Sequence, residues 1–348
     1  MPAIETDSLV LLTGASGFLA AHVAQQLLQR GFRVRGTVRS ASKGEYLDAL
    51  FEKEGLKSKW EWVVVEDVEQ EGAFDEAVKG VDAVLHTASP FHFRVQDPHK
   101  DLINPAVQGT LGALRSAKKE GGVKRIVITS SFAAVVNPHD PVYTFTEKDW
   151  NTFSPKQVEE KGASVDPSQA YRASKTLAER AAWDFVEHEK PGFDIATVNP
   201  PLIFGPIIHQ CESKEKLNTS VNNFYSFLLG SKSAADAQVG FGSLVDVRDV
   251  ARIHIDALVT PEAGGERFLV SNTDSSYQPL LDLFFSAAPP SLLAAFPNAQ
   301  RGNPGQPKPR ANVIDAGKAR KTFGWEPIPV EKTILDMADS LAEYQKQW

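Results

Sequence analysis

The sequence has little cysteine, no long apolar run and no block of basic residues, and each absence excludes a class of protein. Of its 348 residues only Cys211 is a cysteine, so no disulfide can form within the chain, and we expect Cys211 to have no catalytic role. No apolar run approaches the about 20 residues that span a bilayer. The formal net charge is −7, with Lys and Arg scattered along the chain, which argues against a nucleic-acid surface.

Targeting and metal-binding patterns are also missing. The first residues, MPAIETDSLVLL, carry acids early and no basic stretch, unlike a signal or transit peptide, so we expect a soluble cytoplasmic protein that does not enter a membrane. His92 and His99 have no ligand spacing with cysteines or carboxylates, and no metal site is expected. His86 lies in an apolar run, which is typical of a core histidine.

What the sequence does contain is a regular alternation of short apolar runs and helical patterns up to Asn199. Strands are expected at SLVLLTG, FRVRGTVR, WEWVVVED, DAVLHTAS, KRIVITSS and FDIATVNP, and helices at 18–31, 46–55, 73–80, 104–121 and 168–190. Several strands are almost continuously apolar, as in a parallel sheet covered on both faces. The predicted fold class is therefore α/β, with a doubly wound parallel sheet of the Rossmann type.

After Asn199 the alternation breaks, and the break predicts a second, smaller lobe. Residues 205–240 are irregular apart from one helical piece, and the proline-rich stretch 287–310 is expected to be a surface loop. We predict a dinucleotide-binding domain of residues 1–200, to which residues 244–262 return. A discontinuous substrate-binding lobe would comprise residues 201–243 and 263–348, over the carboxyl edge of the sheet, where doubly wound folds bind ligands.

The segment TGASGFLA places two glycines three residues apart between an expected strand and an expected helix. In that context the glycine pattern predicts a dinucleotide-binding turn, although a plain strand-to-helix turn is the alternative. Gly14 permits the tight turn, and Gly17 lets the backbone approach a pyrophosphate at the helix N-terminus. Ser16, Phe18 and Leu19 are the neighbouring cofactor contacts that we expect.

The end of the second expected strand favours NADP(H) over NAD(H). The sequence there is VRSASK, so Arg39 and Lys43 stand where an acidic residue would hold the ribose hydroxyls of NAD. A guanidinium pairs well with a 2′-phosphate, although both side chains could be ordinary surface charges. Asp67, followed by Val68, comes after the third strand and could accept a hydrogen bond from the adenine amino group.

In the stretch SQAYRASK, Tyr171 and Lys175 lie one helical turn apart and point the same way. A free tyrosine, with a pKa near about 10, is a poor acid at neutral pH, and an adjacent ammonium would lower the pKa of Tyr171. A core tyrosine beside a solvated lysine is the alternative interpretation. Ser130 and Ser131, at the end of the strand RIVITSS, supply hydroxyls that can stabilise charge on a carbonyl oxygen.

Taken in order, TGASGF, HTASP, ITSS, YRASK and NPPLIFGP resemble the extended short-chain dehydrogenases/reductases. More closely, the chain is similar to the fungal NADPH-dependent ketone and aldehyde reductases of the methylglyoxal-reductase type, relatives of plant dihydroflavonol reductase. The resemblance implies a catalytic set of Ser131, Tyr171 and Lys175, with Lys175 also binding the nicotinamide ribose. It adds cofactor contacts at Thr87, Ala88, Ser89, Pro200, Ile203 and Ser220. Gln108 stands where many relatives have a proton-relaying asparagine, so a relay through this position is left open.

The expected function is NADPH-dependent reduction of a ketone or aldehyde to an alcohol by a monomer or homodimer acting on small carbonyl compounds. Tyr171 would protonate the carbonyl oxygen that Ser131 holds. The substrate would contact Phe91, Phe132, Val136, Leu202 and Phe224, each of which could equally be a plain core residue. The alternatives within the superfamily are a dihydroflavonol reductase, a hydroxysteroid dehydrogenase or an NAD-dependent nucleotide-sugar epimerase. The alternative from another class is a redox sensor that binds NADP without chemistry.

Overall fold

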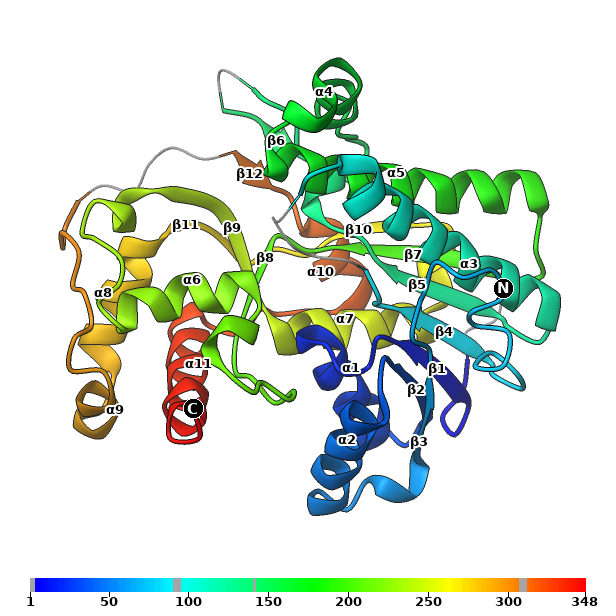
Figure 1. The fold of residues 1–348 in the computed structure, drawn as a ribbon, viewed down its shortest axis with the longest axis horizontal. Helices are drawn as coiled ribbons and strands as arrows, with labels where there is room; N and C mark the ends of the chain where they lie inside the picture. The colour runs from blue at the N-terminus through cyan, green and yellow to red at the C-terminus, as the bar shows by residue number, and fades with distance from the viewer. Residues whose placement is uncertain (1–3, 90–94, 140–141, 307–311) are drawn as a thin grey trace.

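The computed structural model describes residues 4–89, 95–139, 142–306 and 312–348. Within these residues the central sheet has seven strands in the order β10-β7-β5-β4-β1-β2-β3 (Figure 1). All its pairings are parallel. The strands are β1 (Leu9–Thr13), β2 (Arg33–Val38), β3 (Trp60–Val64), β4 (Ala83–His86), β5 (Arg125–Thr129), β7 (Asp194–Asn199) and β10 (Arg267–Leu269). The predicted doubly wound sheet is thereby confirmed, with its switch in strand order between β1 and β4.

Helices cover both faces of this sheet because its strands are apolar on both sides; all five residues of β1 are buried. One face carries α1 (Phe18–Gln29), α2 (Ala41–Lys53) and α7 (Val247–Val259), and the other carries α3 (Asn104–Glu120) and α5 (Pro167–Glu189) (Figure 1). α1 packs against α7, and α3 packs against α5. On α1 the buried residues Leu19, Val23 and Leu27 recur at helical spacing, which turns one side of the helix toward the sheet.

A smaller lobe lies beside the carboxyl edge of the large sheet, on the left of Figure 1. Its three-stranded sheet has the order β11-β9-β8, where β8 is Leu202–Phe204, β9 is Gly240–Asp246 and β11 is Thr273–Ser276. The helices of this lobe are α6 (Thr219–Leu228), α8 (Tyr277–Ala287), α9 (Pro290–Ala295) and α11 (Val330–Gln345). They enclose a separate apolar core. Within the described residues, no helix combines the length and apolar character that crossing a membrane requires.

Two local predictions were wrong. Residues 73–80 form successive turns rather than a helix, because Gly72 and Gly80, with φ of 73° and 68°, interrupt the helical conformation at both ends of a short segment. The proline-rich stretch 287–310 is not entirely a loop, since it contains α9. Leu292 and Phe296 are buried there, which anchors the short helix to the core of the smaller lobe.

The chain also crosses back to the large sheet later than the sequence suggests. β10 pairs with β7 in that sheet, and α10 (Gly317–Phe323) packs against α7 and β10. The prediction placed both segments in the smaller lobe. A two-stranded sheet of β6 (Thr144–Phe145) and β12 (Val313–Ile314) packs against β10. The boundaries of the two predicted lobes stay a prediction.

Candidate active site

The turn after β1 has the shape and polarity that suit an anion. Gly14 has a φ of 68°, and a Cβ there would come within 3.1 Å of the Ala88 backbone, so only glycine fits without strain. Gly17 is the N-cap of α1, and no side chain caps this helix. Thr37 anchors the turn by accepting the Gly14 N–H at 3.0 Å. A helix N-terminus that follows a glycine-containing turn fits the pyrophosphate of a dinucleotide. Of the other predicted contacts, Ser16 lies in this turn, and Phe18 and Leu19 are the first two residues of α1.

The end of β4 is tied to the end of β1 beside this turn. The Thr13 hydroxyl accepts the N–H groups of Thr87 and Ala88, both at 3.1 Å, and lies 3.0 Å from His86 Nδ1. His86 is buried, and burial together with the Lys175 charge lowers its pKa to about 3, so it is a neutral core histidine. Ser89 follows and is partly buried. The predicted contacts at the end of β4 therefore border the glycine turn.

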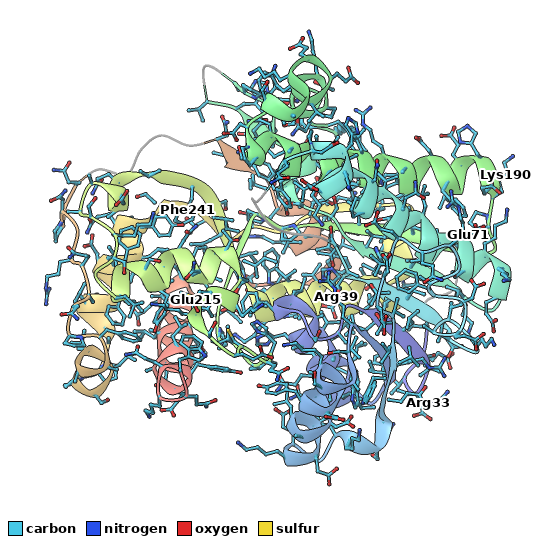
Figure 2. All side chains as sticks on the ribbon, in the orientation of Figure 1. Arg33, Arg39, Glu71, Lys190, Glu215 and Phe241 are labelled. Atoms are coloured by element: carbon cyan, nitrogen blue, oxygen red, sulfur yellow. The ribbon has the colours of Figure 1, made fainter. Side chains whose placement is uncertain are left out.

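Arg39 and Lys43 lie at the carboxyl end of β2 and the start of α2. Figure 2 shows Arg39 and Arg33 at opposite ends of β2. Arg39 is exposed, two residues beyond the threonine that anchors the glycine turn, and Lys43 Nζ lies 3.3 Å from Glu212 Oε1. A cation at this position suits a 2′-phosphate. Asp67 is exposed and accepts a hydrogen bond from the Glu69 N–H, while Val68 packs against α3.

The structure brings Ser131, Tyr171 and Lys175 together where β5 ends. Asp166 caps α5 by accepting the Ser168 N–H at 2.8 Å, and this fixes where the helix starts. Tyr171 is partly buried and hydrogen bonds with Ser131. Lys175 is only 8% exposed, and its Nζ donates to the Thr129 carbonyl at 3.4 Å. The three side chains thus share one edge of the sheet.

The electrostatics of this set differ from the prediction. Burial raises the pKa of Tyr171 to about 12, and the hydrogen bond with Ser131 opposes that rise. The prediction that the ammonium lowers the pKa of Tyr171 was wrong in this structure, because desolvation of the phenolate dominates and Lys175 donates to a backbone carbonyl instead. Burial also lowers the pKa of Lys175 to about 8, against the opposing charge of Glu179.

Three further predicted positions occupy defined places. The Pro200 carbonyl accepts the Phe132 N–H at 2.9 Å and the Ser131 hydroxyl at 3.4 Å, so it helps to hold Ser131. Ser220 is buried, and its hydroxyl donates to the Ile203 carbonyl. Gln108 is exposed on α3, whereas Lys175 is buried, so the structure gives no support to a relay through Gln108.

The predicted substrate contacts separate into two groups. Phe132, which directly follows Ser131, and Val136 are partly buried against a small cluster that contains Phe145, and Leu202 is partly buried on β8. Phe224 is 0% exposed and belongs to the core of the smaller lobe. Phe91 lies outside the described residues.

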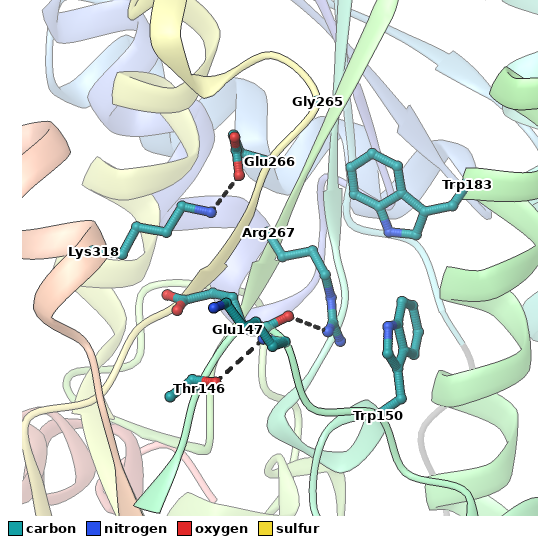
Figure 3. Close-up of a pocket in the computed structure, with 9 residues that line it drawn as sticks. Thr146, Glu147, Trp150, Trp183, Gly265, Glu266, Arg267 and Lys318 are labelled. Carbon is teal, nitrogen blue, oxygen red and sulfur yellow. Dashed lines mark hydrogen bonds and ion pairs between the residues drawn. The ribbon is translucent and has the colours of Figure 1, made fainter.

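The sequence analysis missed one charged residue beside this site. Glu179 follows Lys175 by four residues on α5 and is 2% exposed. The repeat of the four-residue spacing from Tyr171 through Lys175 was the signal that could have revealed it. By contrast, the open pocket of Figure 3, lined among others by Trp150, Trp183 and Lys318, contains none of the predicted site residues.

A Rossmann-type sheet, a glycine turn and a tyrosine–lysine helix define a dinucleotide-dependent enzyme class, and comparison with known proteins agrees. The chain belongs to the NAD dependent epimerase/dehydratase family, whose model matches residues 10–271.

Similar proteins match between about three quarters and nearly the whole of the chain. The putative NADPH-dependent methylglyoxal reductase of Candida albicans is 38% identical over 344 residues, which cover 96% of this chain and 98% of that protein. A ketoreductase of Aspergillus niger is 43% identical over 266 residues, 74% of this chain and 76% of that one. The crystal structure of yeast methylglyoxal/isovaleraldehyde reductase Gre2 complexed with NADPH matches with a TM-score of 0.86 at 34% identity, covering 98% of this chain and 100% of that one.

Proposed function

We propose that this protein is an NADPH-dependent carbonyl reductase that converts a ketone or aldehyde, of the methylglyoxal type or a larger aliphatic or aromatic carbonyl, to the alcohol. The observation that carries the proposal is the meeting of Ser131, Tyr171 and Lys175 at the edge of the sheet that also bears the glycine turn. The reductases named above, with their NADPH dependence, support the same reaction class.

The glycine turn with Arg39 and Lys43 would hold the phosphates of the cofactor, and Lys175 its nicotinamide ribose. When bound, NADPH supplies the hydride that the carbonyl carbon accepts. The chain contributes binding and orientation at one edge of the sheet, where hydroxyl and ammonium groups converge.

Tyr171 acts as the general acid toward the carbonyl oxygen. With a pKa of about 12 the phenol is protonated at neutral pH, which is the form that donates a proton. It is still a much stronger acid than water, whose pKa is about 15.7, so donation to a developing alkoxide is favourable. Ser131, held by Pro200 and hydrogen bonded with Tyr171, orients the same oxygen.

The test is to mix the protein with NADPH or NADH and a panel of methylglyoxal, isovaleraldehyde, diketones and aryl ketones, and to follow the nicotinamide absorbance. We expect NADPH to be consumed with at least some of these carbonyls, and more slowly with NADH. Binding of NADPH without turnover of any carbonyl would favour the redox-sensor alternative. Preference for NADH would refute the role of Arg39. An assembly of one or two copies and a cytoplasmic location stay predictions.

A further inference from the structure

Glu179 extends the row formed by Tyr171 and Lys175 by one more helical turn, and it is almost completely buried. Burying a carboxylate is costly unless hydrogen bonds and an opposite charge compensate for lost hydration. The hydrogen-bond donors around Glu179 supply this compensation.

Donors from β7, from β10, from Ser130 just after β5 and from α5 itself converge on the two carboxylate oxygens. Oε1 accepts from Arg267 Nε at 2.6 Å and from Trp183 Nε1 at 3.3 Å, with the Thr197 hydroxyl at 3.2 Å. Oε2 accepts from Asn199 Nδ2 at 2.7 Å and from the Ser130 hydroxyl. Guanidinium, indole and amide nitrogens can only donate, so this environment suits the ionised carboxylate.

The end of β5 and the two residues after it connect this carboxylate to the proposed catalytic side chains. The Thr129 carbonyl accepts from Lys175, and the next residue, Ser130, donates its hydroxyl to Glu179. The Ser131 carbonyl accepts from Asn199 Nδ2 at 3.3 Å, and the same amide donates to Glu179. The three turns of α5 that carry Tyr171, Lys175 and Glu179 are thus bonded to residues 129–131.

Arg267 anchors the carboxylate from the other side. It is 9% exposed, and its Nη1 donates to the Glu147 and Asp149 carbonyls at 2.6 and 2.7 Å. Its guanidinium carbon lies 3.8 Å from the centre of the Trp150 ring. Figure 3 shows the Arg267 side chain passing between the Glu147 backbone and this indole. The Arg267 guanidinium is therefore held by two backbone carbonyls and the Trp150 ring in addition to Glu179.

We propose that Glu179 is a positioning residue of the reductase, whose carboxylate fixes the strand end that carries Ser131 and places a negative charge one helical turn from Lys175. The inference rests on the proposed roles of Ser131, Tyr171 and Lys175. Glu179 does not need to touch substrate or cofactor. It acts through the hydrogen bonds of Ser130 and Asn199 and through its charge.

Other titratable groups around Lys175 do not supply this charge. His86 faces it from β4 with a pKa of about 3, and His254 of α7, bonded to the Thr129 hydroxyl, has a pKa of about 4, both lowered by burial. Both are neutral at neutral pH. Tyr171 is protonated there, and Arg267 is a cation that is compensated by the carboxylate itself. Desolvation thus lowers the pKa of Lys175, and Glu179 opposes that change.

The decisive variant is Glu179→Gln, which keeps the shape and removes the charge. Lys175 then loses its proton at lower pH, so the alkaline limb of kcat/KM moves to lower pH by on the order of one unit. A second measurement does not depend on turnover: the ¹⁵N NMR titration of the Lys175 ammonium, assigned with Lys175→Met, moves in the same direction. If the wild-type protein reduces no carbonyl, the proposed function fails, while this titration still tests the charge of Glu179.

Asp194→Asn is the matched control. Asp194 pairs with the buried Arg125 at 2.6 Å, and these two residues begin β7 and β5 at the end of the sheet opposite to the candidate site. We expect it to lower the melting temperature and to leave both the alkaline limb and the Lys175 titration unchanged. If Glu179→Gln behaves in the same way, with only a lower melting temperature, the proposal is overturned.

Two milder variants keep the proposal testable if Glu179→Gln fails to fold. Glu179→Asp retains the charge but withdraws it from its donors, and Ser130→Ala removes the bond to β5 without stranding a buried ion. Both variants should lower kcat by roughly tenfold, because a net hydrogen-bond energy of about 1 kcal/mol corresponds to nearly that factor. The alkaline limb of kcat/KM should stay close to its wild-type position. Wild-type kcat in both variants would refute the positioning role.

Discussion

Two buried arginines of the large sheet pair with carboxylates, Arg125 with Asp194 and Arg267 with Glu179. The two pairs differ in how many of their hydrogen-bonding groups have partners and in which residues those partners are. Arg125, 0% exposed at the start of β5, bonds Asp194 through Nε and Nη2 and the carbonyls of Ala257, Thr260 and Pro261 through Nη1 and Nη2. All three of its nitrogens have acceptors in the protein. This pair closes the amino-terminal edge of the sheet.

Arg267 has one nitrogen without a hydrogen-bond acceptor among the described residues, and its partner Glu179 also accepts hydrogen bonds from other residues. Its Nη2 is buried and hydrogen bonds with no described residue, while Glu179 also accepts from Ser130 and Asn199 beside the candidate site. We expect the pair remote from the candidate site to affect stability alone, and the pair whose carboxylate also bonds residues beside that site to affect activity as well. The comparison predicts that substitutions at the two edges of the sheet separate activity from stability.

The largest effect is expected for Tyr171→Phe at the carboxyl edge. Removing the general acid should lower kcat by about 10²- to 10⁴-fold, because phenylalanine has no hydroxyl with which to donate a proton to the carbonyl oxygen. Steady-state kinetics on the best carbonyl of the panel measures the loss, and fluorescence titration should show NADPH binding almost unchanged.

Tyr225→Phe is the control for Tyr171→Phe. Tyr225 is a buried tyrosine of the smaller lobe whose hydroxyl donates to Gln345 at 3.2 Å, so the variant loses a buried phenol hydroxyl away from the sheet edge. Its turnover should equal that of the wild-type protein. Unchanged turnover in Tyr171→Phe would remove this tyrosine from the mechanism.

At the amino-terminal edge the expectation is reversed, and the effect falls on stability. Arg125→Met leaves Asp194 without its ion-pair partner, and breaking a buried pair costs about 3–5 kcal/mol. Urea unfolding should show this loss, while kcat per folded molecule stays at the wild-type value. Lys318→Met, which breaks the partly exposed pair with Glu266, should cost less than about 1 kcal/mol. A large loss of kcat in Arg125→Met would end the distinction between the two edges.

The regular part of the molecule could be predicted because its signals are local. Alternating apolar runs were enough for the parallel sheet, and the glycine turn and the four-residue spacing on α5 located the candidate site within it. Gly14 illustrates the reason: its positive φ and its contact with Ala88 follow from one short segment meeting its neighbouring strand.

What could not be predicted depends on contacts between distant segments. The pKa of Tyr171 is set by burial rather than by the lysine one turn away, and burial is a property of the assembled lobes. Phe224 is an apolar residue of the kind that lines pockets, but it lies on the side of α6 that faces the core of the smaller lobe. Glu179 looks like an ordinary helix-surface glutamate until Arg267, 88 residues later, reaches it.

A smaller effect than those of Tyr171→Phe and Arg125→Met is expected along a single strand, β2. Arg39→Ser at the carboxyl end should weaken NADPH binding by about 10- to 100-fold, because a hydrogen bond to a charged phosphate contributes about 1.5–3 kcal/mol and each 1.4 kcal/mol is tenfold. NADH, which lacks the 2′-phosphate, should bind as before. Arg33→Ser removes an arginine from the opposite end of the same strand, where its Nε donates to the Asp7 carbonyl, and should change neither affinity. Equal losses for NADPH and NADH in Arg39→Ser would show that Arg39 supports the fold of the turn rather than the phosphate.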